Sequence, residues 1–263
     1  MKLDGAHVRY ATEGGVARIT LARPGVLNAL DTRLAEELAE ATALAEKDPE
    51  AWVVVVSGEG RAFSSGMDRT ALSGGGIGEA FFRQWIRALN GLEDMPKLVV
   101  AAIHGYCIGG GLQLALACDF RLCASDAVLG LGATRHGLIP DGAVLRLARI
   151  VGLGRAKELA LLNEHVSPDR AAAMGLVNWV VPPAELDAAL ARVLAQCLQA
   201  APTAAAHTKR LLQASFHGDR RAMIEEVVAA QMACLASWEM AEANRAWDEK
   251  REARFYPRPS AGR

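Results

Sequence analysis

The sequence predicts an α/β protein in which strands and helices alternate along most of the chain. Two apolar runs, at 52–57 and 98–103, are rich in valine and indicate strands that are buried on both faces. Each run leads through a glycine-rich turn toward a helical pattern, which is typical of α/β layering. From about residue 202 onward the pattern is almost entirely helical. We therefore expect a core in residues 1–200 and a helical region in residues 201–263.

The first elements are predicted to be a hairpin and a helix. Residues 8–10 and 16–21 alternate or run apolar on either side of two glycines, which predicts a β-hairpin. Asp31 then stands where a helix N-cap is expected. The apolar face of that helix is predicted to consist of Leu34, Leu38, Ala41, Leu44 and Ala45. A second helix is expected at about 79–92.

The second buried strand leads into a triple glycine, 109–111, which opens a predicted helix at 112–118. Short strands are expected at 120–123 and 127–129. Helices should then dominate from about residue 142, interrupted by an apolar stretch at 176–181.

Composition and charge exclude several classes of protein. The 263 residues are 51% apolar with a net charge of −1, which excludes a mainly disordered chain. The 29 basic residues against 30 acidic ones give no excess for binding nucleic acid, and the longest apolar run is too short to span a bilayer. The five cysteines lie in apolar runs without metal-ligand spacing, so buried thiols and no metal site are expected. Residues 1–18 lack the apolar segment of a signal peptide, and we expect a cytoplasmic location.

Two glycine-rich turns, 62–68 and 104–111, are candidate functional segments. Glycine lets a backbone N–H approach a ligand without a Cβ in the way, and the first amides of a helix are unpaired. Such amides can stabilise a carbonyl oxygen that becomes an anion during a reaction. The spacing is not that of a dinucleotide motif, and a triple glycine alone also fits tight packing of a strand on a helix.

Taken together, the order and spacing of several segments resemble the crotonase superfamily of enoyl-CoA hydratases and isomerases. The matching stretches are 21–30, 62–68, 96–103, 109–119, 175–177 and 247–251. The resemblance implies the crotonase (ClpP-like) fold, a spiral of β-β-α units with a helical C-terminal trimerisation region. It also implies a homotrimer or a hexamer, and a coenzyme A thioester as substrate, with no other cofactor.

The resemblance further implies roles for individual residues. The backbone N–H groups of Met67 and Gly110 would form an oxyanion hole for the thioester enolate. Arg23 and Lys250 match positions at which basic side chains contact the phosphates of coenzyme A, although solvated surface charges fit them nearly as well. The expected substrate-binding residues are Arg23, Ala62, Ser65, Asp68, Gln113, Ala133 and Lys250.

The two positions that hold catalytic glutamates in hydratases of this superfamily hold Gln113 and Ala133 here. Neither side chain exchanges a proton near neutral pH. Asp141 is the carboxylate that remains nearby; its local sequence fits a helix N-cap. The resemblance instead implies a catalytic role, because dienoyl-CoA isomerases, ring-epoxyphenylacetyl-CoA isomerase and 4-chlorobenzoyl-CoA dehalogenase use aspartate there. The apolar neighbours Leu138, Ile139 and Val144 should raise its pKa.

The sequence therefore favours an enoyl-CoA isomerase in which Asp141 is the only proton shuttle. Three alternatives stay open: a hydratase, an aryl-CoA dehalogenase-like enzyme using Asp141, and an acyl-CoA-binding protein without catalysis. The dehalogenase alternative is weakened because the tryptophan and histidine that it requires fall at Ala133 and at Gln84, which is next to Trp85. His136 is interpreted as a hydrogen-bonded turn residue.

Overall fold

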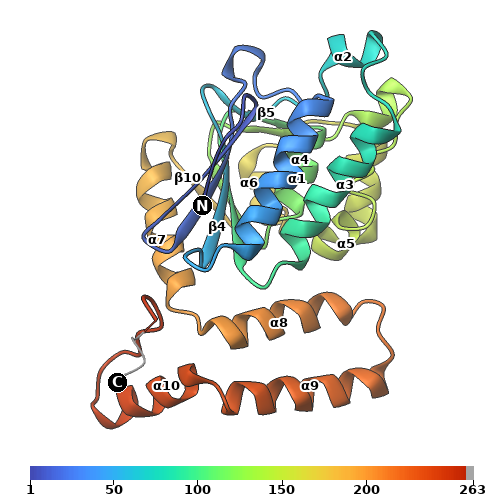
Figure 1. Ribbon diagram of the computed structural model, residues 1–263. Helices are drawn as coiled ribbons and strands as arrows, with labels where there is room; N and C mark the ends of the chain where they lie inside the picture. The colour runs from blue at the N-terminus through green and yellow to red at the C-terminus, as the bar shows by residue number, and fades with distance from the viewer. Residues whose placement is uncertain (259–263) are drawn as a thin grey trace.

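The computed structural model describes residues 1–258, which form two β-sheets wrapped by helices (Figure 1). The larger sheet has the strand order β1-β2-β3-β4-β6-β8-β10, and the smaller has the order β5-β7-β9. In the larger sheet, β1 to β3 are antiparallel and every later pair is parallel. The strands are β1 (Lys2–Asp4), β2 (Val8–Glu13), β3 (Val16–Leu21), β4 (Val53–Gly58), β5 (Ala62–Ser64), β6 (Leu98–Ile103), β7 (Tyr106–Ile108), β8 (Phe120–Ala124), β9 (Val128–Gly130) and β10 (Trp179–Val181).

Successive strand pairs place one strand in each sheet, which confirms the expected spiral of β-β-α units. The pairs β4 and β5, β6 and β7, and β8 and β9 each start in the larger sheet and end in the smaller one. The glycine-rich segments expected to be turns thus contain β5 and β7. These strands have only three residues each, so they show no readable alternation in the sequence.

Helices cover both faces of the larger sheet and extend below it. The α-helices are α1 (Thr32–Lys47), α2 (Arg69–Ser73), α3 (Glu79–Asp94), α4 (Gly110–Leu116), α5 (Leu147–Lys157), α6 (Pro168–Ala173), α7 (Leu186–Leu198), α8 (Pro202–Ala214), α9 (Arg220–Leu235) and α10 (Trp238–Asp248). Shorter helical turns are η1 (Pro24–Val26), η2 (Ala133–His136), η3 (Glu158–Leu162) and η4 (Pro183–Glu185). Figure 1 shows α1 and α3 side by side, α7 on the other side of the sheet, and α8 to α10 below the core. None of the described helices is both long and apolar enough to cross a membrane.

The apolar core lies on both sides of the larger sheet. Val54 and Val56 of β4 face the core beneath α1 and α3, whereas Val53 and Val55 face α7. This arrangement confirms that β4 is buried on both faces. The predicted cap is also confirmed, because the Asp31 carboxylate accepts a hydrogen bond from the Leu34 amide at 2.8 Å.

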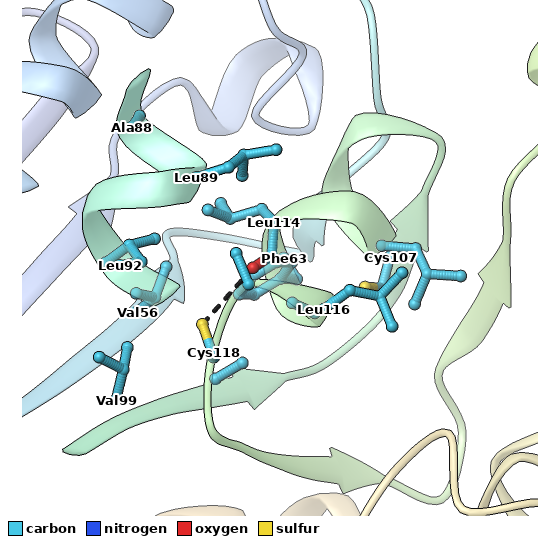
Figure 2. Close-up of a cluster of buried hydrophobic side chains, with 14 of the residues drawn as sticks. Val56, Phe63, Ala88, Leu89, Leu92, Val99, Cys107, Leu114, Leu116 and Cys118 are labelled. Atoms are coloured by element: carbon cyan, nitrogen blue, oxygen red, sulfur yellow. Dashed lines mark hydrogen bonds between the residues drawn. The ribbon is translucent and has the colours of Figure 1, made fainter. Parts of the chain in front are cut away.

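The packing of α3 against α4 positions residues that line the candidate site. Figure 2 shows Ala88, Leu89 and Leu92 of α3 next to Leu114 of α4 in one buried cluster. The thiol of Cys118 donates to the Leu114 carbonyl at 3.5 Å, and burial raises the pKa of this thiol to about 12. The thiol is therefore neutral near pH 7 and acts as an apolar filler.

A buried lysine fixes the first C-terminal helix to the core. Lys209 of α8 donates to the carbonyls of Leu92 and Lys97 at 3.1 and 3.0 Å and to the Asp119 carboxylate at 2.9 Å. The side chain of Lys209 is almost fully buried. The division at residue 200 remains a prediction, and residues 259–263 of the expected helical region lie outside the described residues.

Candidate active site

A cavity of about 440 Å³ lies between the two glycine-rich segments and the aromatic face of α3. Its lining is mostly apolar, with few polar groups, as is usual for small-molecule sites. Among the residues predicted from the sequence, it brings together Ser65, Met67, Gly110, Gln113, Ala133 and Asp141.

Two backbone amides at the cavity wall have no acceptor within the described chain. The Met67 amide makes no hydrogen bond among residues 1–258. On either side of it, the Gly66 carbonyl accepts from the Leu30 amide and the Asp68 amide donates to the Leu30 carbonyl, both at 2.8 Å. Gly110 is the first residue of α4, so its amide lacks an intrahelical acceptor. The two segments are in close contact, because a Cβ on Gly66 would lie 3.4 Å from the Gly110 nitrogen. The pair is therefore available to an oxygen atom of a ligand.

The triple glycine serves packing as well as the site. A Cβ on Gly111 would lie 2.5 Å from the Ser64 carbonyl oxygen, which no side chain could tolerate without a backbone shift. Glycine thus allows α4 to begin directly against β5, and this contact holds the Gly110 amide at the cavity.

Asp141 lies in an irregular turn that faces the same cavity. The sequence places it directly before a helix, but this is wrong: α5 begins only at Leu147, and residues 141–146 form turns. The reason is a long-range contact, because the Gly142 amide donates to the Gln113 side-chain oxygen at 2.7 Å and not along a helix. The Asp141 carboxylate therefore caps no described helix, and its buried Oδ2 has no hydrogen-bond partner in the described chain.

Burial raises the pKa of Asp141 above its usual range, against the opposing effects of the Gly142 amide, the Arg146 charge and the Gln113 side chain. The neighbours expected to cause this effect contribute less than predicted, because Ile139 and Val144 are 69% and 54% exposed. The buried Gln113 and Gly142, which are joined by a hydrogen bond, pack close to Asp141 on its other side.

Gln113 links α3, α4 and the Asp141 turn. Its side-chain oxygen accepts from the Gly142 amide at 2.7 Å and from the Trp85 indole N–H at 3.5 Å. The side chain is nearly fully buried, so this position supplies orientation and not proton transfer.

Residues 11–258 match the family model described as Enoyl-CoA hydratase/isomerase. The chain belongs to the enoyl-CoA hydratase/isomerase family. It is 31% identical over 251 residues to a short-chain-enoyl-CoA hydratase from Clostridium acetobutylicum, covering 91% of this chain and 94% of the relative. It is 35% identical to a carnitinyl-CoA dehydratase from Salmonella arizonae, over 78% of this chain and 79% of that protein.

Solved structures agree with this family assignment. An enoyl-CoA hydratase from Polaromonas superposes with a TM-score of 0.87 at 29% identity, covering 94% of this chain and 98% of that one. The predicted crotonase fold is thereby confirmed. The names of these relatives do not bear out a particular closeness to epoxyphenylacetyl-CoA isomerase or to the dehalogenase.

Several residues expected to bind substrate in this family member lie outside the cavity lining. The Arg23 guanidinium is 3.2 Å from the carboxylates of both Asp31 and Asp68, and Asp68 also caps α2. Ala62 is fully buried within β5. Lys250 follows α10, which Figure 1 shows below the core and away from the glycine-rich segments. A phosphate contact by Arg23 or Lys250 remains a prediction.

Sequence reasoning did not single out Phe81 and Phe82 of α3, which together with Trp85 give the cavity an aromatic wall. Phe81, Phe82 and Trp85 line the cavity, and the rings of Phe81 and Trp85 stack at 6.2 Å with an interplanar angle of 13°. The i, i+4 spacing of Phe81 and Trp85 was the available signal. Trp85 and not Gln84 lines the cavity, so this chain has no histidine at that place. Arg69 of α2 also lines the cavity and was not anticipated.

The raised pKa of Asp141 predicts that ionisation of this residue lowers the stability of the folded protein. Because the folded protein binds this proton more tightly than the unfolded chain, stability is lost as pH rises through the folded pKa. We expect Asp141→Asn to unfold at a higher urea concentration than the parent at pH 7, with the difference vanishing below about pH 4, where the unfolded carboxyl is also protonated. The measurement is a urea titration of each variant between pH 4 and pH 7, with the exposed Asp126→Asn as control. A difference in urea midpoint between Asp141→Asn and the parent that did not change with pH would contradict the expectation.

Proposed function

We propose that this family member is an isomerase that moves the double bond of an enoyl-CoA, with Asp141 as its only proton shuttle. The observation that carries the proposal is one carboxylate with an unpartnered buried oxygen, in the same apolar cavity as the free amides of Met67 and Gly110. Among the described residues that line this cavity, Asp141 is the only carboxylate.

In this mechanism the thioester oxygen accepts hydrogen bonds from the Met67 and Gly110 amides. Asp141 removes a proton from the α-carbon, and the electrons pass to the thioester oxygen to give an enolate. The amides stabilise this charge in a site with little water, where fixed dipoles are most effective. The enolate then collapses as Asp141 returns the proton to the γ-carbon, so the double bond moves from the β,γ to the α,β position. The raised pKa of Asp141 brings it closer to the operating pH, which favours transfer in both directions.

Hydration is the second candidate, and the names of the relatives favour it. Addition of water requires activation of a water molecule and protonation of the α-carbon. Gln113 and Ala133 supply no acid or base for either step, so Asp141 would have to perform both. Isomerisation requires one group that takes and returns a proton, which matches the single carboxylate.

The two remaining alternatives have less support. A dehalogenase-like reaction would lack the partner side chains at Gln84 and Ala133. A pure binding protein would have no need of a desolvated carboxylate without an ion-pair or capping partner, because such burial is costly.

We also propose that the protein assembles as a homotrimer or a dimer of trimers. An exposed apolar row on α9 supports assembly through the C-terminal helices, because apolar surface of this extent usually marks an interaction site. The row consists of Ile224, Val227, Val228, Met232 and Leu235.

The proposed reaction is tested by incubating the purified protein with a 3-enoyl-CoA and recording the ultraviolet absorbance of the conjugated 2-enoyl thioester. We expect the conjugated product to accumulate. A parallel incubation with a 2-enoyl-CoA measures hydration as loss of that absorbance. Faster hydration than isomerisation would overturn the proposal in favour of a hydratase. No reaction in either sample, with thioester binding verified by calorimetry, would favour the binding protein.

A further inference from the structure

A buried arginine holds the turn that carries Asp141. The Arg146 guanidinium donates to the Gly142 carbonyl at 3.0 Å and to the Asn90 side-chain oxygen at 2.7 Å, and it lies 2.5 Å from the Glu93 carboxylate. Only 2% of the Arg146 side chain is exposed. Arg146 thus ties the irregular turn at residues 141–146, whose backbone bonds mix i→i−3 and i→i−4 spacings, to helix α3.

Gly142, the residue after Asp141, is therefore fixed by hydrogen bonds to both its amide and its carbonyl. The Gly142 amide is bound by Gln113 of α4, and the Gly142 carbonyl is bound by Arg146. Gln113 is in turn contacted by Trp85 of α3, the helix that also carries Asn90 and Glu93. Because the Asp141 carboxylate oxygen Oδ2 has no partner, the direction of this side chain depends on the backbone that these contacts fix.

We propose that Arg146, anchored by Asn90 and Glu93, is a positioning residue that holds the Asp141 carboxylate in line with the oxyanion hole. The inference rests on the proposed role of Asp141 as proton shuttle. The Nε of Arg146 is buried with no acceptor among residues 1–258. An unsatisfied buried donor is destabilising, so the best explanation for the arginine is the contacts of its other two nitrogens.

Charged groups on several elements surround Asp141 and must be considered in any pH experiment. Arg69 of α2 and His136 of η2 line the same cavity. Glu93 of α3 faces Arg146 and is also 3.6 Å from Arg149 of α5. Behind the turn, Arg146 shares a smaller cavity with Asp119 and Arg121. The positive charge of Arg146 lowers the pKa of Asp141, so its removal should raise that pKa.

The test compares Arg146→Met and Arg146→Lys with the control Arg149→Met. Arg149 also faces Glu93 and lies over the Phe216 ring, but it makes no described side-chain hydrogen bond to the Asp141 turn. For each variant we would measure kcat and KM with a 3-enoyl-CoA and the pH midpoint of kcat. The ionisation of Asp141 would be followed separately by isotope-edited infrared spectroscopy, with Asp141→Asn identifying its carboxyl band.

Arg146→Met is expected to lower kcat by about tenfold to a hundredfold with little change in KM, because small misplacements of a catalytic group have effects of this size. The pH midpoint of kcat and the infrared midpoint should both rise. Arg146→Lys should restore the midpoint through its charge but only part of kcat, because one ammonium group cannot reproduce the planar set of donors that bridges Gly142 and α3. Arg149→Met should leave kcat and the midpoint near the parent values.

The inference would be overturned if Arg146→Met had the same kcat and pH midpoint as the parent. It would also be overturned if Arg149→Met changed these quantities as much as Arg146→Met does. If Arg146→Met does not fold, Glu93→Gln decides the question. It keeps an acceptor for Arg146 but removes a negative charge, so the infrared midpoint should fall, and an unchanged midpoint would contradict the inference. The infrared readout requires no turnover. A parent that fails to isomerise would therefore refute the proposed function, while the shifts would still test the role of Arg146.

Discussion

Replacement of Asp141 by asparagine is expected to lower isomerase kcat by about a thousandfold while leaving thioester binding nearly unchanged. Asparagine preserves the size of the side chain but cannot accept and return a proton, and positioned general acid–base groups contribute roughly 10²- to 10⁴-fold. The Met67 and Gly110 amides and the apolar cavity remain, so the thioester should still bind. The rate is measured from the absorbance of the conjugated product, and binding by calorimetry with a saturated acyl-CoA.

The exposed Asp126→Asn serves as the matched control for this experiment, because it makes the same chemical change outside the cavity. It should retain parent activity. If Asp141→Asn kept more than about a tenth of the parent rate, a loss too small for a sole proton shuttle, another group would have to move the proton. His136, whose imidazole can act as an acid or a base, also lines the cavity.

Gly66→Ala is expected to lower kcat by about a hundredfold. Gly66 has a φ of +88°, and a Cβ there would lie 2.8 Å from the Ile108 carbonyl oxygen as well as close to the Gly110 nitrogen. Since both obstacles are backbone atoms, the two segments must move apart. The Met67 and Gly110 amides could then no longer bind one oxygen together. Removal of a single oxyanion-hole donor typically costs about 10²- to 10³-fold in kcat.

Gly14→Ala separates this effect from backbone strain. Gly14 also has a positive φ, +57°, but a Cβ there would meet nothing within 4 Å, and it lies in the β2–β3 turn. We expect this variant to be somewhat less stable and fully active. Comparable losses of kcat in the two variants, each corrected for the folded fraction, would show that strain and not separation of the amides is responsible.

The sequence was sufficient for the parts of the fold that leave a periodic signal. The buried valines of β4, the capped helix α1 and the β2–β3 hairpin are all present as predicted. Strands β5 and β7 of the second sheet were not anticipated, because these three-residue strands form through contacts with neighbours in space. Likewise, no local pattern delays α5 to Leu147; that delay depends on hydrogen bonds from the Asp141 turn to Gln113 and Arg146.

The candidate site, like the fold, could be predicted from the sequence only in part. Met67, Gly110, Gln113 and Asp141 were found through the resemblance to a family, and the structure gathers them around one cavity. Arg23 illustrates what sequence cannot supply, because its two carboxylate partners come from segments far apart along the chain. Arg146 was missed for a similar reason, since its contacts with α3 exist only in the folded protein.

The proposed oxyanion donors of this site are peptide groups, and this has a consequence for how its chemistry can change over evolutionary time. No substitution at position 67 can delete an amide that every residue except proline carries. Mutation therefore acts mainly on the neighbouring side chains, such as Gln113, Ala133 and Asp141, which are open to exchange one codon at a time. Under the proposed mechanism, the capacity to stabilise an enolate is inherited with the fold, whereas the reaction that follows from the enolate is decided by a few replaceable side chains.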